Sequence, residues 1–444
     1  MSEAVRDKAP AGPASAGVRT VRVGLIGLGT VGAALVRLLD DRGGDIAERA
    51  GFRLEVTRAA TRDLSRDRGL PLESGRITGD PMEVVADPGV DVVCELIGGL
   101  EPARSIVLDA LDRGKPVVTA NKELLATMGR DLFDVAERRG VDLAFEGAVG
   151  GGIPLVRALK ESLAAERVKR VVGIVNGTTN LILTRMAEDG VSFEEALAEA
   201  QRLGYAEADP SADVDGHDAA AKCAILASIA FNSRVVARDV FREGIGGLTP
   251  VDFRTAAELG FVIKPVAIAE LEDEDVAVRV HPAMLPAEHP LAAVRDAFNA
   301  VFVEGDRAGQ LMLYGRGAGG EPTATAVAGD LVRVGRNLVL GGRSIGCTCY
   351  LERRIRPMDD MEAAYYLLLD VVDRPGVLAQ VAGTFGAHAV SIKSVLQEDT
   401  GDGAQLVMIT HRAREGDLQA TVKDLDALEP VHAVRSVLRV EQIE

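Results

Sequence analysis

The sequence predicts an α/β protein with a Rossmann-type doubly wound parallel sheet, a central α+β domain and a small C-terminal ferredoxin-like domain. Three observations support this fold class. A glycine-rich turn at residues 27–32 joins the first strand pattern to the first helix pattern. Strand and helix patterns then alternate to about residue 150, and the last eighty or so residues follow the order βαββαβ. The length of 444 residues leaves room for two to four domains.

The first domain is predicted over residues 18–150, after a tail at 1–17 whose Ala, Pro, Gly and charged residues are typical of disorder. Short apolar runs predict its buried strands at 21–26, 54–60, 90–97, 115–122 and 141–145. Helical patterns lie between them, at 33–39, 103–113 and 123–139. This alternation is typical of a parallel sheet with helices on both faces.

The pattern changes in the second domain, predicted over 151–315. A strand at 170–175 is followed by helical segments to about residue 257, and strand patterns appear at 276–280, 300–304 and 311–313. A glycine-rich stretch then precedes a helix predicted within about 316–340, and residues 341–362 have no clear period, as expected of a linker.

The C-terminal domain is predicted over 363–444. Its strands are expected at 364–372, 390–398, 405–411 and 434–440, with helices at 377–387 and 416–428. Residues 399–403 read as the turn of a hairpin between its second and third strands.

Composition limits the classes of function. The chain has 67 acidic and 50 basic residues, a net charge of −17, which argues against nucleic acid as the main partner. The four cysteines form no Cys-x-x-Cys pair, and no histidine pair has metal-ligand spacing. The apolar stretch 219–231 is too short for a membrane span and the start lacks a signal-peptide core, so we expect a cytoplasmic protein without membrane contact.

The glycine turn predicts a dinucleotide site, because glycine lets the backbone approach a pyrophosphate at a helix N-terminus. Its residues are Gly27, Leu28, Gly29, Thr30, Val31 and Gly32. The second strand ends without the acidic residue that binds a free ribose hydroxyl; Arg62 lies there instead. Arg62 favours NADP over NAD, although a solvated surface arginine explains it almost as well.

Two lysines are candidate catalytic groups. Lys122 follows a predicted parallel strand at the edge where ligands bind, and burial lowers the pKa of a lysine there. Lys122 could act as an electrostatic partner or proton donor for a bound ligand. The alternative is a lysine at the start of a helix whose side chain faces water. Lys222 interrupts an apolar helix, four residues after Asp218 and on the same face, so it needs a buried partner unless it reaches solvent.

Upstream of Lys222, five carboxylates lie between Glu207 and Asp218, and Asp213 is one of them. Such a cluster suits a ligand with an ammonium group, such as an amino acid. A metal is the alternative, but histidine pairs and regular loop spacing are lacking. In the C-terminal domain, the turn from Asp373 to Gly376 could accept a ligand carboxylate at the following helix, although a simple strand–helix turn explains it better.

With these motifs in order, the chain resembles bacterial homoserine dehydrogenases of the long form, which carry a C-terminal ACT domain. The resemblance extends from about residue 20 and rests on five motifs. They are Gly-Leu-Gly-Thr-Val-Gly at 27–32, Thr-Ala-Asn-Lys at 119–122, Gly-Gly-Gly-Ile-Pro at 150–154, Asn-Gly-Thr-Thr-Asn at 176–180 and Gly-Tyr-Ala-Glu-Ala-Asp-Pro at 204–210.

The resemblance implies reversible reduction of L-aspartate 4-semialdehyde to L-homoserine with NAD(P)H, a step toward threonine, methionine and isoleucine. The residues that match the family's motif take over its roles: Lys222 donates the proton, Asp218 positions Lys222, and Lys122 contacts cofactor and substrate. Glu207, with Asp213, holds the substrate's amino group.

Other matches imply further sites. A sodium site matches Glu146, Val149, Gly151 and Ile153, and Gly319 belongs to a second glycine loop, with Gly317, that returns to the nicotinamide. The ACT domain implies feedback by an amino acid, with threonine as the first candidate, near Asp373 and Gly376. The family implies a homodimer through the central domain or a homotetramer.

Two other functions share features with this sequence. An ACT-bearing 2-hydroxyacid dehydrogenase needs a histidine–carboxylate pair near the cofactor, but His217 lies beside the better-placed Asp218 and Lys222. An amino-acid sensor with a vestigial nucleotide fold has no need of Lys122 or Glu207. Both alternatives are therefore disfavoured.

Overall fold

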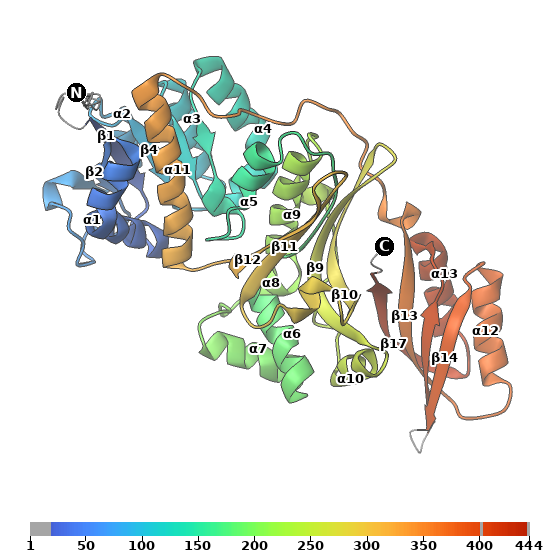
Figure 1. The fold of residues 1–444 in the computed structure, drawn as a ribbon. Coiled ribbons are helices and arrows are strands. Elements are labelled where there is room, and N and C mark those ends of the chain that lie inside the picture. The colour runs from blue at the N-terminus through green and yellow to red at the C-terminus, as the bar shows by residue number, and fades with distance from the viewer. Residues whose placement is uncertain (1–18, 400–402, 442–444) are drawn as a thin grey trace, which may run out of the picture.

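The computed structural model describes residues 19–399 and 403–441, arranged as three parts in a row (Figure 1). The parallel-sheet domain lies at one end, the C-terminal domain at the other, and a mixed sheet with its helices between them. The predicted tail at 1–17 and most of the predicted hairpin turn, at 400–402, lie outside the described residues.

The first domain is a six-stranded parallel sheet in the order β3-β2-β1-β4-β5-β6, which confirms the predicted Rossmann arrangement. The strands are β1 (Thr20–Ile26), β2 (Arg53–Ala60), β3 (Ile77–Thr78), β4 (Val92–Glu95), β5 (Val117–Thr119) and β6 (Leu143–Ala144). The helices are α1 (Thr30–Ala50), α2 (Pro81–Ala86), α3 (Ala103–Asp112) and α4 (Lys122–Arg139). The strand order reverses between β1 and β4, where open α/β sheets bind their ligands.

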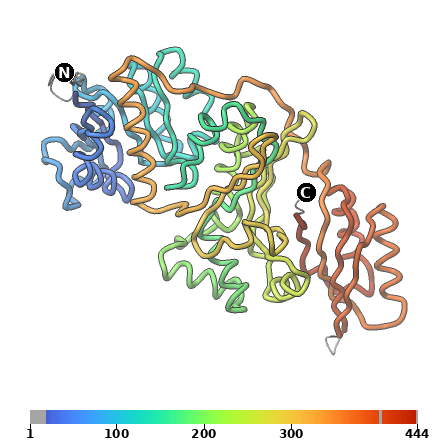
Figure 2. The backbone as a smooth tube through the Cα atoms, viewed as in Figure 1, coloured from blue at the N-terminus to red at the C-terminus, as the bar shows by residue number. Residues whose placement is uncertain are grey.

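A late helix completes this domain. β12 runs to Arg316, and α11 (Gly320–Leu340) then returns from the central part to lie beside α1 (Figure 2). The buried side chains of Val327 and Leu331 join the core formed by Leu25 and Leu35. The domain is thus built from two distant chain segments.

The central sheet has the order β12-β11-β7-β9-β10. Its strands are β7 (Val168–Ile174), β9 (Phe261–Glu272), β10 (Asp275–Pro286), β11 (Phe298–Gly305) and β12 (Gly309–Arg316), with β8 (Phe241–Arg242) beside β10. The helices are α5 (Leu155–Arg157), α6 (Gly177–Asp189), α7 (Phe193–Arg202), α8 (Ser211–Val214), α9 (His217–Ala230) and α10 (Pro250–Glu258). α9 packs on β9 and β10 with most of its side chains buried.

The C-terminal domain has the predicted βαββαβ order. Its strands are β13 (Glu362–Val371), β14 (Ile392–Asp399), β15 (Ala404–Thr410) and β17 (Val431–Val440), with a short β16 (Ala413–Arg414). α12 (Val377–Ala387) and α13 (Glu415–Asp426) complete it. β17 also pairs in parallel with β10, through Ala283↔Arg439 and Met284↔Val440, so its sheet continues the central sheet.

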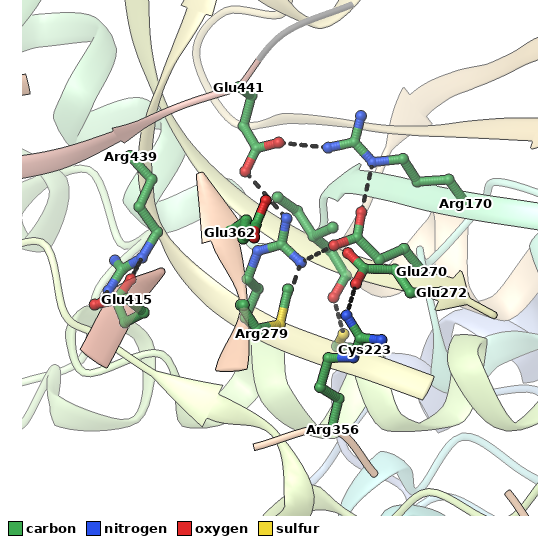
Figure 3. A network of polar contacts seen from close by, with 12 residues as sticks. Arg170, Cys223, Glu270, Glu272, Arg279, Arg356, Glu362, Glu415, Arg439 and Glu441 are labelled. Atoms are coloured by element: carbon green, nitrogen blue, oxygen red, sulfur yellow. Dashed lines mark hydrogen bonds and ion pairs between the residues drawn. The ribbon is translucent and has the colours of Figure 1, made fainter. Parts of the chain in front are cut away.

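Buried ion pairs hold this junction together (Figure 3). The guanidinium of Arg279 pairs with Glu270 and, at 3.3 Å, with Glu441; Arg170 pairs with the same two carboxylates. Burial raises the pKa of Glu441, but the two arginines lower it by more than burial raises it, so the net shift is downward. Each charge in this four-membered ring is paired, as buried charges must be.

Residues 341–362 form little regular structure but are held in place. The Ser344 amide donates to Asp142 (2.9 Å), the Cys347 amide to Glu137 (3.0 Å) and the Leu351 amide to the Asn232 carbonyl (2.8 Å). This segment therefore packs along α4 and the end of α9 on its way to the C-terminal domain. Among the described residues, no helix combines the length and apolar character needed to cross a membrane.

Candidate active site

The glycine turn has the geometry of a dinucleotide loop. Gly27 has a φ of +105°, and a Cβ atom there would lie 2.8 Å from the backbone of Leu96. A Cβ at Gly32 would lie 1.9 Å from the Gly27 carbonyl oxygen. In contrast, nothing lies within 4 Å of a Cβ at Gly29, the residue that precedes α1. The open backbone at this helix N-terminus can receive a pyrophosphate.

A cavity of about 280 Å³ lies beside this turn. It is lined by Val31 from α1, Ile97 from the loop after β4, Lys122 from the start of α4 and Lys222 from α9. Gly151 and Gly317 also line it, and a Cβ at Gly151 would lie 2.6 Å from the Gly317 carbonyl carbon. The two predicted glycine loops therefore meet at one cavity, between the first and central domains.

The second glycine loop ends at the start of α11. Gly319 precedes this helix with a φ of +117°, and a Cβ at Gly320 would lie 3.0 Å from the Thr30 methyl group. The first turns of α1 and α11 therefore lie side by side. Gly319 itself is not among the residues that line the cavity.

Two lysines from different domains share one carboxylate at this cavity. Lys122 Nζ lies 2.7 Å from Asp218 Oδ1, and Lys222 Nζ lies 2.7 Å from Asp218 Oδ2. Lys222 Nζ also donates to the Val175 carbonyl oxygen at 2.7 Å. An ammonium group has three N–H donors, so Lys222 keeps one for a ligand oxygen.

The local chain positions these groups. Asn121 caps α4 by accepting from the Leu124 amide (3.0 Å), which fixes Lys122 at the first turn after β5. Asp218 and Lys222 lie one turn apart in α9, as their spacing predicts. Lys222 is only 8% exposed, so its side chain does not run out to solvent.

The lysines control the ionisation of the carboxylate. Burial raises the pKa of Asp218, but the ammonium groups of Lys222 and Lys122 lower it well below its ordinary value. Burial likewise lowers the pKa of Lys122, but Asp218 outweighs this and the pKa is raised. The net shift of the Lys122 pKa is therefore opposite to the lowered pKa predicted from burial alone. The site carries two positive charges and one negative charge, which suits an oxygen that gains negative charge.

Asn176 is a part of the site that the sequence did not assign. Its Nδ2 donates to Asp213 (2.6 Å) and to Asp218 (2.8 Å), while its Oδ1 accepts from the Thr179 amide (2.8 Å) and so caps α6. An asparagine just before a helix is a known capping signal, but its contact with two distant carboxylates is not visible in the sequence.

The remaining candidate residues, Glu207, Arg62 and His217, make no hydrogen bond or ion pair with either lysine. Glu207 is exposed, and its carboxylate makes no hydrogen bond or ion pair among the described residues. Arg62 is also exposed. The neighbouring Arg68 donates to the Leu28 carbonyl and to Thr61 Oγ1, each at 3.0 Å, and so ties the glycine turn to the end of β2. His217 lies against Arg242 rather than at the cavity.

The candidate sodium ligands lie on one turn. The buried Glu146 accepts from the Val156 and Arg157 amides (2.8 and 2.9 Å), and the Ile153 carbonyl accepts from Leu155 (2.9 Å). The carbonyl oxygens of Val149 and Gly151 accept no hydrogen bond from the described part of the chain. Two free carbonyl oxygens in this segment fit a hard cation better than a soft metal.

The candidate effector turn lies in the C-terminal domain, between β13 and α12. Gly376 has a φ of +92° and immediately precedes α12, and Asp373 accepts a hydrogen bond from Gln397 of β14 (3.4 Å). Nothing lies within 4 Å of a Cβ at Gly376, so the turn is open.

Fold and site together define an NAD(P)-dependent oxidoreductase with an ACT domain. Three family models match: the NAD-binding domain of homoserine dehydrogenase at residues 27–146, homoserine dehydrogenase at 154–332 and the ACT domain at 365–430. The homoserine dehydrogenase of Mycobacterium tuberculosis is 50% identical over 434 residues, covering 95% of this chain and 98% of the relative. The chain belongs to the homoserine dehydrogenase family.

Solved structures agree. A homoserine dehydrogenase from Thiobacillus denitrificans superposes with a TM-score of 0.91 at 42% identity, covering 96% of this chain and 99% of that one. A hyperthermophilic archaeal homoserine dehydrogenase mutant in complex with NADPH has a TM-score of 0.61 at 27% identity, covering 71% of this chain and 98% of that one.

Proposed function

We propose that the chain reduces L-aspartate 4-semialdehyde to L-homoserine with NADPH, reversibly, and that Lys222 is the proton donor. The observation that supports this role most directly is the Lys222 ammonium at the cofactor cavity, with two donors held by Asp218 and Val175 and a third left over. A bound reduced nicotinamide supplies the hydride. Lys222 binds the aldehyde oxygen, stabilises its growing negative charge and transfers a proton to it.

Asp218 is a positioning residue in this mechanism. It holds Lys222 and Lys122 on its two oxygens and thereby directs both ammonium groups toward the cavity. Lys122, which is partly exposed there, contacts cofactor and substrate. The substrate brings its own ammonium group, for which we propose Glu207 and Asp213 as partners. Asp213 lies on the Asn176 network already, whereas Glu207 must approach from an exposed loop.

We propose that NADP is preferred over NAD, because Arg62 lies exposed at the end of β2 and can pair with a ribose phosphate. Calorimetric titration of NADPH and NADH into the wild type and Arg62→Ala tests this. Arg62→Ala should weaken NADPH binding about tenfold and leave NADH binding unchanged. Equal losses for both cofactors would contradict the assignment.

A sodium ion is proposed at the turn of Glu146, Val149, Gly151 and Ile153. Its support is the oxygen-only donor set with two free carbonyl groups. At constant ionic strength, NaCl should raise Tm above the value in choline chloride, because the ion binds the folded state. Equal Tm values in the two salts would argue against the site.

The ACT domain is proposed to bind an amino-acid effector, threonine first among candidates, near Asp373 and Gly376, between paired domains. Support comes from the free edge strand β14, on which Val395 and Leu396 are 39% and 43% exposed. Unpaired strand edges pair readily with a second copy. Pairing there, together with dimerisation through the central domain, makes a homodimer or a homotetramer in the cytoplasm.

One assay tests the proposed reaction. NADPH oxidation is followed with L-aspartate 4-semialdehyde, and then with threonine added. Oxidation that depends on the aldehyde and yields homoserine supports the function. No oxidation would reject it, and oxidation unaffected by threonine would reject only the effector.

A further inference from the structure

A second cavity is separate from the active site. It measures about 470 Å³ and lies between α4, the end of α9 and the segment 347–353. Much of its wall is apolar, formed by side chains that include Leu125, Phe133, Ile225, Ile229 and Val235. Neither Lys122 nor Lys222 lines it.

One buried ammonium group faces this cavity. Lys160 is 4% exposed, and its Nζ lies 5.3 Å from the ring centre of Phe133 and 5.4 Å from that of Phe145. It makes no hydrogen bond or ion pair with any residue in 19–399 or 403–441. Burial lowers the pKa of Lys160 to about 8, and Arg333 lowers it as well. Two aromatic faces compensate a desolvated ammonium only in part.

We propose that this cavity binds a small monocarboxylate with an apolar body. The carboxylate accepts hydrogen bonds from Lys160, which has all three N–H donors unused by side chains or carbonyls of the described protein. The body of the ligand packs on the apolar wall. Ligand sites of this kind combine a mainly apolar surface with a few placed polar groups.

The charge of the wall favours a monoanion over a phosphate. Asp134, Glu137 and Glu352 line the cavity together with Arg130, Arg234 and Arg353, so these six charges balance and Lys160 adds one net positive charge. Phosphate sites commonly use backbone amides at a helix N-terminus or a bidentate arginine. Here Arg130 lies 3.9 Å from Asp134, Arg353 is paired with Glu274 and Arg234 is exposed, so Lys160 is the buried cation that the described residues leave for a ligand.

The test is calorimetric titration of the full-length protein with 3-phenylpropanoate and 3-methylbutanoate, and with 3-phenylpropanamide as the uncharged analogue. At least one acid should bind saturably, and 3-phenylpropanamide should bind at least about tenfold more weakly than 3-phenylpropanoate. Absence of saturable binding by both acids, or equal affinity of the matched acid and amide, would overturn the proposal.

Variants locate the site. Lys160→Met should lose at least about tenfold in acid affinity, the effect of one hydrogen bond to a charged group. Lys169→Met is the matched control, because Lys169 is 61% exposed and pairs with Asp306. Its affinity should equal that of the wild type. Unchanged binding by Lys160→Met, or an equal loss in both variants, would contradict the role of Lys160.

A second variant tests the same cavity in case Lys160→Met does not fold. Gly129 lines the cavity from α4, and a Cβ there would meet nothing within 4 Å. Gly129→Leu should therefore fold, keep Lys160 and fill the cavity. It should abolish saturable binding of the acids while Tm stays at or above the wild-type value. Wild-type affinity in Gly129→Leu would place the ligand elsewhere and overturn the proposal.

Discussion

Lys122 and Lys222 are hydrogen-bonded to opposite oxygens of one buried carboxylate, each at 2.7 Å. One lysine begins α4 of the nucleotide domain and the other lies in α9 of the central part. Asp218 therefore links the domain that binds the cofactor to the helix that carries the proton donor. Any change to this carboxylate should affect stability, catalysis and their pH dependence together.

Asp218→Asn should destabilise the protein at pH 7 by about 3 kcal/mol, because two ammonium groups lose their shared counter-charge. The folded-state pKa of Asp218 is depressed, so its contribution is present above the unfolded pKa and disappears as pH falls through the folded value. The difference in urea midpoint between wild type and variant should thus be full at pH 7 and shrink below about pH 4. Asp131→Asn, at an exposed position of α4, is the control. A difference that grows in acid would contradict the account.

Two substitutions at Asn176 should distinguish its role in capping α6 from its role in positioning Asp213 and Asp218. Asn176→Ala removes the cap of α6 and should lower stability by about 1 kcal/mol, with a loss of activity. Asn176→Asp can still cap α6 but places a third carboxylate beside Asp213 and Asp218. It should retain a Tm closer to wild type and still lose kcat/KM at neutral pH. Wild-type activity in Asn176→Asp would show that the amide donor is dispensable.

The two glycines at the start of α1 should respond differently to alanine. Gly32→Ala forces a methyl group to within 1.9 Å of the Gly27 carbonyl oxygen and should lower Tm. Gly29→Ala has open space around its methyl group and should fold normally, but the methyl group should raise the Kd for NADPH. Thermal unfolding and titration with NADPH measure both effects. Normal cofactor binding by Gly29→Ala would mean that the pyrophosphate lies elsewhere.

The sequence predicted what depends on local pattern. The glycine turn, the parallel strands and the βαββαβ domain are all confirmed, because each shows its own apolar period or turn residues. β9 (Phe261–Glu272) escaped prediction because Lys264 and Pro265 interrupt its apolar run. Lys264 is nevertheless buried, and its ammonium donates to the Val294 carbonyl at 2.5 Å.

Features that depend on distant segments could not be predicted. The spacing of Asp218 and Lys222 on one helix face was visible, but the approach of Lys122 from 96 residues away (218 − 122) was not. The pairing of β17 with β10 has only two residue pairs and no sequence signal. Segment 341–362, expected as a linker, also lines the cavity beside Lys160, because its backbone amides donate hydrogen bonds to Glu137 of α4 and to the Asn232 carbonyl after α9.

The most direct test of the central claim is a comparison of wild type and Lys222→Met in NADPH oxidation with L-aspartate 4-semialdehyde, with NADPH binding measured on the same samples. Loss of the proton donor should lower kcat by about 100- to 10,000-fold while the Kd for NADPH stays within about twofold of wild type. A Lys222→Met variant that retains the wild-type kcat would contradict the assignment of Lys222 as the proton donor.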